Sequence, residues 1–311
     1  MTALALPRRR RLAPLARREA KWGVIFIAPW IIGFLAFTLL PMIATLVFTF
    51  TNINLDQREP LRFVGVDNYR TLLADGQAWD SLGITLRFAL IALPIGVFLP
   101  LVVALLLSSR HLAAAGLFRV LFFLPYVVPF VAGVLIWQTM LNPADGWLDV
   151  FLRWIGVPNP PDWLRDTTWI YAGLVLMGIW GIGGGVIVYL AGLRGIPSEL
   201  YDAAKIDGAG YLAQLRHVTI PMLTPVIFYT LILGIVEVLQ YFLVPLVLNQ
   251  GTGEPGGSTL FLNLYIYKSF FGYHDLAYGS TIAWFLFGIT LLITLALFGT
   301  ARRWVFYAGD R

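Results

Sequence analysis

Cysteine is absent from the 311 residues, and charged side chains are scarce. Without cysteine the chain can form no disulfide, no thiolate metal site and no cysteine nucleophile. Only 13% of the residues are charged and 59% are hydrophobic, whereas an average soluble domain has about 25% charged and about 45–50% apolar residues. This composition predicts that most of the chain lies in a lipid bilayer rather than in water.

Motifs for binding nucleotides or metals are also missing. The glycines around 181–185 follow no predicted strand and precede no Lys-Ser/Thr pair, so close helix packing explains them better than a phosphate loop. The glycine-rich stretch at 251–257 likewise lacks a following lysine. His111, His217 and His274 are far apart in the sequence. We therefore predict no catalytic residue, no metal ligand and no cofactor bound by this chain.

Six apolar runs are each long enough to cross a bilayer, which needs about 20 residues. They lie near 23–50, 84–108, 117–141, 169–192, 222–248 and 280–301. The first run is too long for the core of a signal peptide, so we interpret it as a membrane helix. The sequence therefore predicts an all-α polytopic membrane protein: a basic segment at 1–22, a six-helix transmembrane domain at 23–301 and a C-terminal tail at 302–311.

The positive residues predict the orientation of these helices. Fifteen Lys and Arg residues lie in the N-terminal segment, the second and fourth connections and the C-terminal tail, against six in the other three connections. By the positive-inside rule, both termini are expected in the cytoplasm and the protein in the cytoplasmic membrane. The basic run before residue 22 then reads as a membrane anchor beside lipid, and not as a nucleic-acid site.

The fourth connection, at 194–221, has a pattern of its own. Pro197 can open a short helix, and Gly208 can supply the left-handed turn that ends it. A second short helix fits Gly210 to His217, and Pro221 marks the expected transition into the fifth span. The pattern predicts a helix-turn-helix knob on the cytoplasmic side of the membrane.

This connection resembles the loop of the permeases of binding-protein-dependent ABC importers, which carries E-A-A, three residues, G, nine residues and I-x-L-P. Here Asp202-Ala203-Ala204, Gly208 and 218–221 (Val-Thr-Ile-Pro) fit that spacing without a gap. Asp replaces Glu, Val replaces Ile and Ile replaces Leu. Further segments resemble the carbohydrate-type permeases related to the maltose and glycerol-phosphate systems, among them Phe63 to Tyr69 (FVGVDNY).

The resemblance implies a type I ABC importer permease that moves a sugar or polyol by alternating access. It also implies its partners: a second homologous permease, two ATPase subunits that bind ATP and Mg, and an extracytoplasmic solute-binding protein. The knob would be an EAA-type coupling helix-turn-helix that docks on an ATPase subunit. The coupling residues would be Tyr201, Asp202, Ala203, Ala204, Asp207, Gly208 and Pro221.

The fifth span suggests part of the substrate path. Glu237, Gln240 and Tyr241 share one stripe of a continuous helix, and together they offer acceptors, donors and an aromatic face. Trp137 and Trp180, in other spans, could add stacking surfaces. The alternative is that the stripe bonds to neighbouring helices or to the partner permease.

Two other functional classes remain open at this stage. An ion-coupled secondary transporter would need ionisable residues along its path, and only Arg87 and Glu237 lie inside the spans. A membrane-embedded transferase would need acidic or histidine clusters at the membrane face, and no such spacing occurs.

Overall fold

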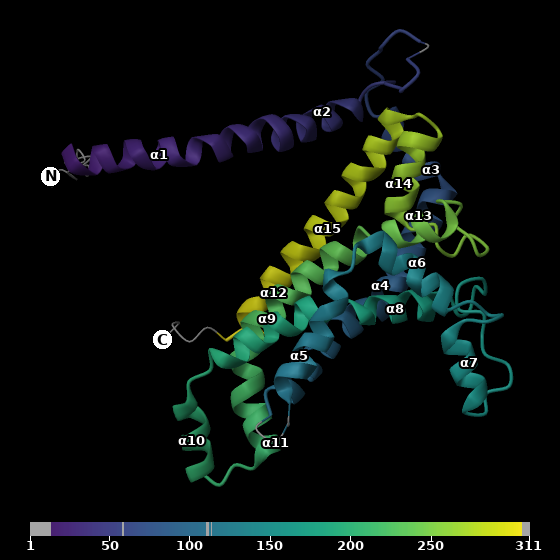
Figure 1. Ribbon diagram of the computed structural model, residues 1–311. Coiled ribbons are helices and arrows are strands. Elements are labelled where there is room, and N and C mark those ends of the chain that lie inside the picture. Colours follow the sequence, from purple (N-terminus) through teal and green to yellow (C-terminus); the bar gives the residue numbers. More distant parts are fainter. Residues whose placement is uncertain (1–13, 58, 110–111, 113, 307–311) are drawn as a thin grey trace.

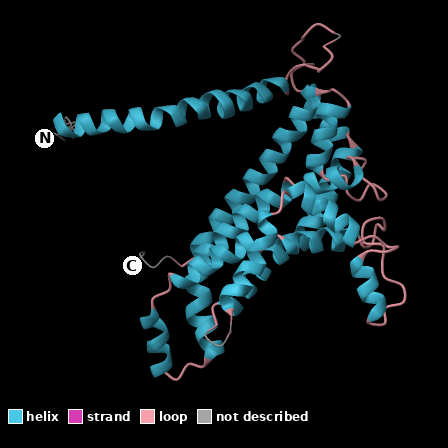
Figure 2. Ribbon diagram, viewed as in Figure 1, coloured by secondary structure: helices cyan, strands magenta, loops and turns pink. Residues whose placement is uncertain are grey.

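The computed structural model describes residues 14–57, 59–109, 112 and 114–306. Within these residues the chain is helical throughout, with loops between the helices and no named strand (Figure 2). The predicted all-α class is confirmed. The first part of the basic segment and the last five residues of the tail lie outside the described residues.

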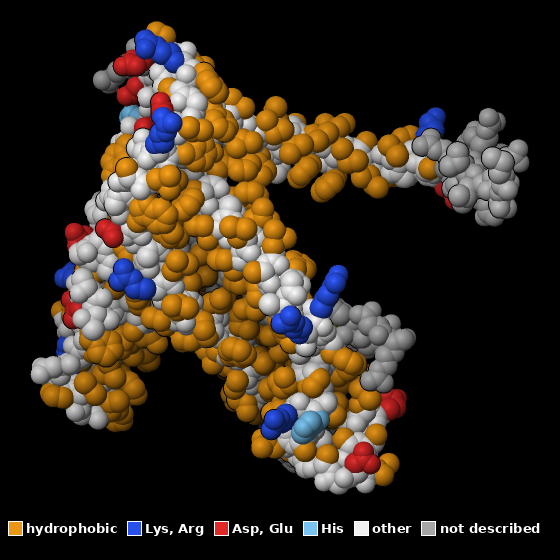
Figure 3. Space-filling model, turned by 180° about the vertical axis from the view of Figure 1, so that it is seen from behind, with side chains coloured by type: hydrophobic (Ala, Val, Ile, Leu, Met, Phe, Trp, Pro, Cys, Tyr) orange, Lys and Arg blue, Asp and Glu red, His pale blue; other side chains and the backbone are white. Residues whose placement is uncertain are grey.

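A long N-terminal arm projects from the rest of the molecule (Figure 1). It consists of α1 (Pro14–Phe34), the π-helical turn η1 (Leu35–Leu39) and α2 (Leu40–Phe48). Only its α2 end packs against the helix α15. Its apolar side chains from Trp22 to Val47 are therefore mostly exposed, and they form a hydrophobic surface along this part of the arm (Figure 3).

The remaining helices form the body. They are α3 (Asp67–Ala74), α4 (Gly76–Leu107), α5 (Ala115–Phe123), the 3-10 turn η2 (Leu124–Val127), α6 (Phe130–Met140), α7 (Trp147–Trp154), α8 (Ile170–Trp180), α9 (Gly183–Arg194), α10 (Ser198–Ile206), α11 (Tyr211–Gln214), the π turn η3 (Leu215–Thr219), α12 (Ile220–Leu239), α13 (Leu243–Asn249), α14 (Leu262–Tyr267), the π turn η4 (Lys268–Gly272) and α15 (Leu276–Trp304). In the body, α4 packs against both α9 and α12, and α12 packs against α15.

Four helical stretches among the described residues are long and apolar enough to cross a membrane: 18–48, 76–107, 211–249 and 276–304. Two bent pairs raise the number to six if each pair is one span. The first pair, 116–127 with 130–140, bends by 103°, and the second, 170–180 with 183–194, bends by 53°. The six apolar runs of the sequence thus all contain helix, but the third and fourth are broken.

Proline explains the sharper break. Pro129 has no N–H to donate, and it forces Val128 out of the helical region, to ψ 130°. Two other prolines, Pro41 and Pro221, leave their helices unbroken. In each case a π turn ends two residues earlier, and the residue before the proline donates its N–H to the carbonyl five residues back. The widened turn accommodates the proline ring, which would otherwise collide with the carbonyl four residues back.

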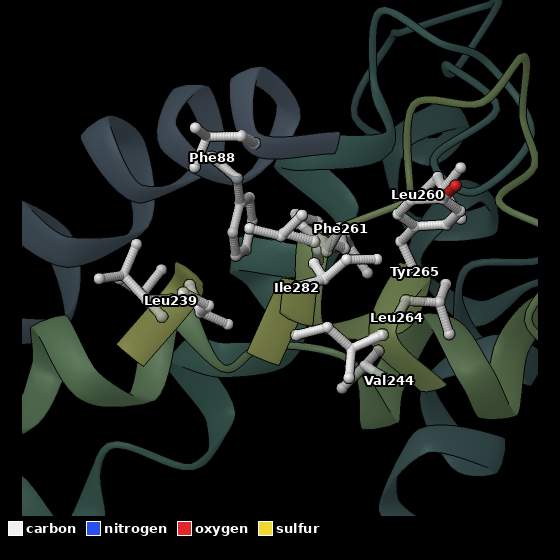
Figure 4. Packing of buried hydrophobic residues seen from close by; sticks show 14 of the residues in the cluster. Phe88, Leu239, Val244, Leu260, Phe261, Leu264, Tyr265 and Ile282 are labelled. Atoms are coloured by element: carbon white, nitrogen blue, oxygen red, sulfur yellow. The ribbon is translucent and has the colours of Figure 1, made fainter. Parts of the chain in front are cut away.

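Two hydrophobic clusters hold the body together. The larger one centres on Phe261, Leu264 and Ile282, all fully buried, with α4 and α12 contributing Phe88 and Leu239 (Figure 4). The smaller cluster joins α4, α9 and α12 on the side of α10, around Tyr189 and Leu223.

A partly buried carboxylate network stabilises the end of the body that carries α3 and α14. Asp75 caps α4 through the backbone N–H of Gln77, at 2.9 Å. Its other carboxylate oxygen accepts the hydroxyl of Tyr265, at 2.7 Å, and the hydroxyl of Tyr278. Burial acts to raise the pKa of Asp75, but these hydrogen bonds outweigh it, so the pKa lies below its usual value. The network joins α4, α14 and α15.

Candidate functional site

A cavity of about 460 Å³, the central cavity, lies between α4, α8, α9 and α12. This volume is within the range of about 300–1,000 Å³ typical of small-molecule sites. Most of its lining is apolar, and Pro100 and several glycines contribute to the wall. The polar side chains that line it are Tyr126, Tyr189, Tyr229, Thr230, Glu237 and Tyr241.

Glu237 and Tyr241 both face the central cavity, but the continuous stripe predicted for the fifth span is wrong. Helix α12 ends at Leu239, and Tyr241 lies in the short non-helical segment before α13. Gln240, the residue between them, does not line the cavity. Its backbone carbonyl instead accepts a hydrogen bond from the side-chain amide of Asn263, at 2.8 Å. The structure therefore brings two of the three predicted residues together.

Trp137 and Trp180 lie outside the lining of the central cavity. Their rings pack edge to face on each other, with centroids 6.2 Å apart. The ring of Trp180 also lies so close to Gly133 that a Cβ there would meet it at 3.2 Å. The two tryptophans join the broken third and fourth spans, and their predicted stacking role in the substrate path has no support in this arrangement.

The sequence reasoning missed a pair of hydroxyls in the cavity wall. Tyr189 of α9 and Thr230 of α12 share a hydrogen bond of 2.6 Å. Both lie within apolar runs, where a lone Tyr or Thr is easily taken for packing. Their position 41 residues apart on different helices left no local spacing signal to find them.

The glycines at 183–185 bring the backbone of α9 close to its neighbours. A Cβ at Gly183 would lie 2.2 Å from the carbonyl oxygen of Phe122 in α5. Cβ atoms at Gly184 and Gly185 would meet the ring of Tyr126 at 3.3 Å and Pro100 at 3.1 Å. The packing interpretation of this cluster is confirmed, and the packing closes one wall of the central cavity.

The predicted knob is present at the end of the molecule opposite α3 and α14 (Figure 1). Helix α10 ends at Ile206, and Gly208, two residues further on, adopts φ +77°. The N–H of Ala209 bonds to the carbonyl of Ala204 at 2.8 Å, and the N–H of Gly208 bonds to that of Lys205 at 3.0 Å. These two bonds form a Schellman cap, in which Asp207 is the C-cap residue. The left-handed turn predicted at Gly208 is confirmed.

The second half of the knob differs from the prediction. Instead of a separate short helix from Gly210 to His217, α11 and η3 continue directly into α12. Pro221 therefore marks no transition, because the π turn η3 carries the helix past it. The hydroxyl of Tyr201 in α10 bonds to that of Thr219 in η3, at 3.0 Å, and holds α10 against this helix.

The tip of the knob exposes apolar side chains. Ile206, Tyr211 and Leu212 are 87%, 72% and 76% exposed. Asp202 forms an exposed ion pair with Lys205 at 2.8 Å, and Ala203 is exposed as well. A Cβ at Gly208 would meet nothing within 4 Å, so there is open space around this turn. The tip therefore presents an exposed apolar patch to its surroundings.

Residues 88–307 match the family described as binding-protein-dependent transport system inner membrane component. A probable ABC transporter permease protein of Bacillus subtilis, YesP, is 33% identical over 293 residues, with 94% of each chain covered. The lactose transport system permease protein LacF of Rhizobium radiobacter is 33% identical over 283 residues, which cover 90% of this chain and 94% of the relative.

A solved structure shares the fold. It is the bacterial alginate ABC transporter in complex with an alginate pentasaccharide-bound periplasmic protein, and one of its chains superposes with a TM-score of 0.79 at 24% identity. The superposition covers 92% of this chain and 96% of that one. The chain therefore belongs to the family of binding-protein-dependent transport system inner membrane components, the permease subunits of ABC importers.

Proposed function

We propose that this permease moves a sugar or a related polyol through the central cavity, by alternating access. The proposal rests on one observation: a continuous helical segment joins the exposed knob to the wall of the central cavity. The rod from α11 through η3 to α12 bears the exposed knob at one end and Glu237, in the cavity wall, at the other. Movement at the knob can thereby change the shape of the cavity. The lactose permease among the relatives supports a saccharide as cargo.

The remaining subunits of the proposed importer follow from the surfaces of the chain. We propose that the knob docks on one of two ATPase subunits, which bind ATP and Mg, because its tip exposes Ile206, Tyr211 and Leu212. We also propose that the apolar N-terminal arm packs against lipid and a second homologous permease. The distribution of Lys and Arg supports cytoplasmic termini in the inner membrane. A solute-binding protein would then deliver the sugar at the opposite end of the body.

The sugar path can be tested with three variants of the complete importer reconstituted in vesicles. Tyr241→Ala and Glu237→Gln change side chains that line the central cavity, whereas Gln240→Ala changes a neighbour that does not. We expect the first two to lose most sugar uptake while ATP hydrolysis stimulated by the solute-binding protein persists. Gln240→Ala should transport normally. Unchanged uptake in both cavity variants would contradict the proposal.

A further inference from the structure

A second cavity, the loop-side cavity, is as large as the central one and far more polar in its side chains. Its volume is about 470 Å³, and it lies between the first turns of α4, the segment around the start of α8 and the loop before α14. None of its lining residues lines the central cavity. Its lining includes Asp80, Ser81, Arg87, Thr167, Tyr171 and Ser258.

A layer of aromatic rings separates the two cavities. Phe88 contacts Tyr171, Tyr241 and Phe261, with ring centroids 5.6, 4.9 and 5.2 Å away. Phe88 and Tyr241 line the central cavity, whereas Tyr171 lines the loop-side cavity. Figure 4 shows Phe88 and Phe261 facing each other in this layer. The loop-side cavity is therefore distinct from the central cavity.

Arg87 brings a positive charge to the wall of the loop-side cavity, where its side chain is exposed. It lies within the membrane-spanning range of α4, where a charged side chain is unfavourable unless it has a partner or a polar cavity. Its Nε donates to the carbonyl of Gly83 at 3.2 Å, which orients the guanidinium. Within the described part of the chain, no carboxylate lies within ion-pair distance of Arg87, and no hydrogen bond involves its two terminal nitrogens.

The carboxylate that shares the cavity, Asp80, forms no ion pair with Arg87 among the described residues. Asp80 precedes Arg87 by seven residues, or about 10 Å along the helix axis. The guanidinium is therefore free to bind a ligand anion through two parallel N–H groups, the geometry that suits a carboxylate. Asp80 can at the same time accept hydrogen bonds from hydroxyl groups at the other end of the cavity.

Ser81 has an unpaired hydroxyl just beneath the wall of the cavity. Its side chain is fully buried beside the cavity, and its Oγ has no hydrogen-bond partner among the described residues. Leaving a buried hydroxyl unpaired is unfavourable. Thr167 and Tyr171 contribute further hydroxyls, and the ring of Tyr171 contributes an aromatic face. Such a set of donors, acceptors and an aromatic face matches a polyhydroxylated ligand.

We propose that the loop-side cavity is a second saccharide subsite, and that Arg87 binds an anionic group of the sugar, such as the carboxylate of a uronate unit. The inference rests on the proposed function, because it assumes a sugar as cargo. It adds a substrate class, an acidic saccharide, and a specificity-determining residue outside the central cavity.

The absence of cysteine from the chain makes a labelling test direct. Thr167→Cys places one thiol in the wall of the loop-side cavity in the assembled importer. Its reaction with a membrane-impermeant maleimide is measured with digalacturonate, with an oligoglucuronate and with neutral maltotriose. We expect an acidic sugar to slow labelling at least about fivefold, and maltotriose to have little effect. Val157→Cys, on an exposed loop outside the cavity, should label equally fast in all conditions.

Arg87→Gln, combined with Thr167→Cys, should label normally but lose the protection by acidic sugars, and Arg87→Lys should keep part of it. Protection that survives Arg87→Gln, or equal protection by maltotriose, would overturn the role of Arg87. Absence of protection by every sugar would overturn the subsite. If the same preparation still imports sugar and responds to its solute-binding protein, the proposed function stands although this inference has failed.

Discussion

The sharpest prediction concerns Gly208, because the structure separates two reasons why a side chain there would be harmful. The first is backbone strain: at φ +77° an L-residue is disfavoured, by about 1–2 kcal/mol for an ordinary side chain and by less for Asn. The second is crowding of the ATPase surface on which the knob is proposed to dock. Within this chain there is no crowding, since a Cβ would meet nothing within 4 Å.

The expected size of the effect on coupling depends on the short length of α10. Its nine residues are too few for a stable isolated helix, so it depends on its cap and on the bond from Tyr201. A loss of about 1–2 kcal/mol lowers the ratio of capped to uncapped knob about 5- to 30-fold. We therefore expect Gly208→Ala to reduce ATPase-coupled uptake strongly, and Gly208→Asn to reduce it less, while the transmembrane body keeps its melting temperature.

The assay is uptake and stimulated ATP hydrolysis in vesicles, with co-purification of the ATPase subunits as a second readout. Gly210→Ser is the matched control, because Gly210 has φ −69° and open space around it, and Ser suits the N-cap position that it occupies. If Asn at 208 impairs coupling more than the smaller Ala, crowding and not backbone strain controls the site. Normal coupling in both variants would refute the docking role of this turn.

Two further predictions test the body of the protein. Asp75→Asn should lower the melting temperature in detergent at neutral pH. Because the pKa of Asp75 is depressed in the folded protein, the difference in melting temperature between wild type and variant should persist above about pH 4, the usual pKa of a carboxyl group. This difference should shrink as the pH falls from there towards the folded pKa. A constant difference down to pH 3 would contradict this. Gly183→Ala should destabilise the protein by about 1–3 kcal/mol or prevent its accumulation, because its Cβ would meet a backbone carbonyl of α5. Gly178→Ala, whose Cβ meets nothing within 4 Å, should be well tolerated in thermal unfolding.

The sequence predicted those features that depend on local chemistry. The apolar runs predicted the helical segments. Gly208 adopts the left-handed turn that was predicted for it. The errors concern prolines and long-range contacts. Pro129 breaks the third apolar run, whereas a π turn lets a helix pass Pro221, and the proline alone does not distinguish the two outcomes.

The candidate site could be predicted only in part for the same reason. Glu237 and Tyr241 were found because they are close in the sequence and polar within an apolar run. The partnership of Tyr189 with Thr230, and the cavity around Arg87, depend on helices that meet only in the folded chain. Trp137 and Trp180 illustrate the converse case. Their aromatic rings suggested contact with a ligand, but in the folded chain they pack on each other between the third and fourth apolar runs.

The π turn at 215–219 has a mechanical consequence. Because the chain stays helical past Pro221, the segment from Tyr211 to Leu239 is one rod about 43 Å long, at about 1.5 Å per residue. A pivot of about 5° at one end of such a rod displaces the other by about 4 Å, roughly the width of a methylene group in van der Waals contact. In the proposed alternating access, the continuous helix would pass such a displacement from the knob to the cavity wall that contains Glu237, whereas a hinge at Pro221 would absorb it.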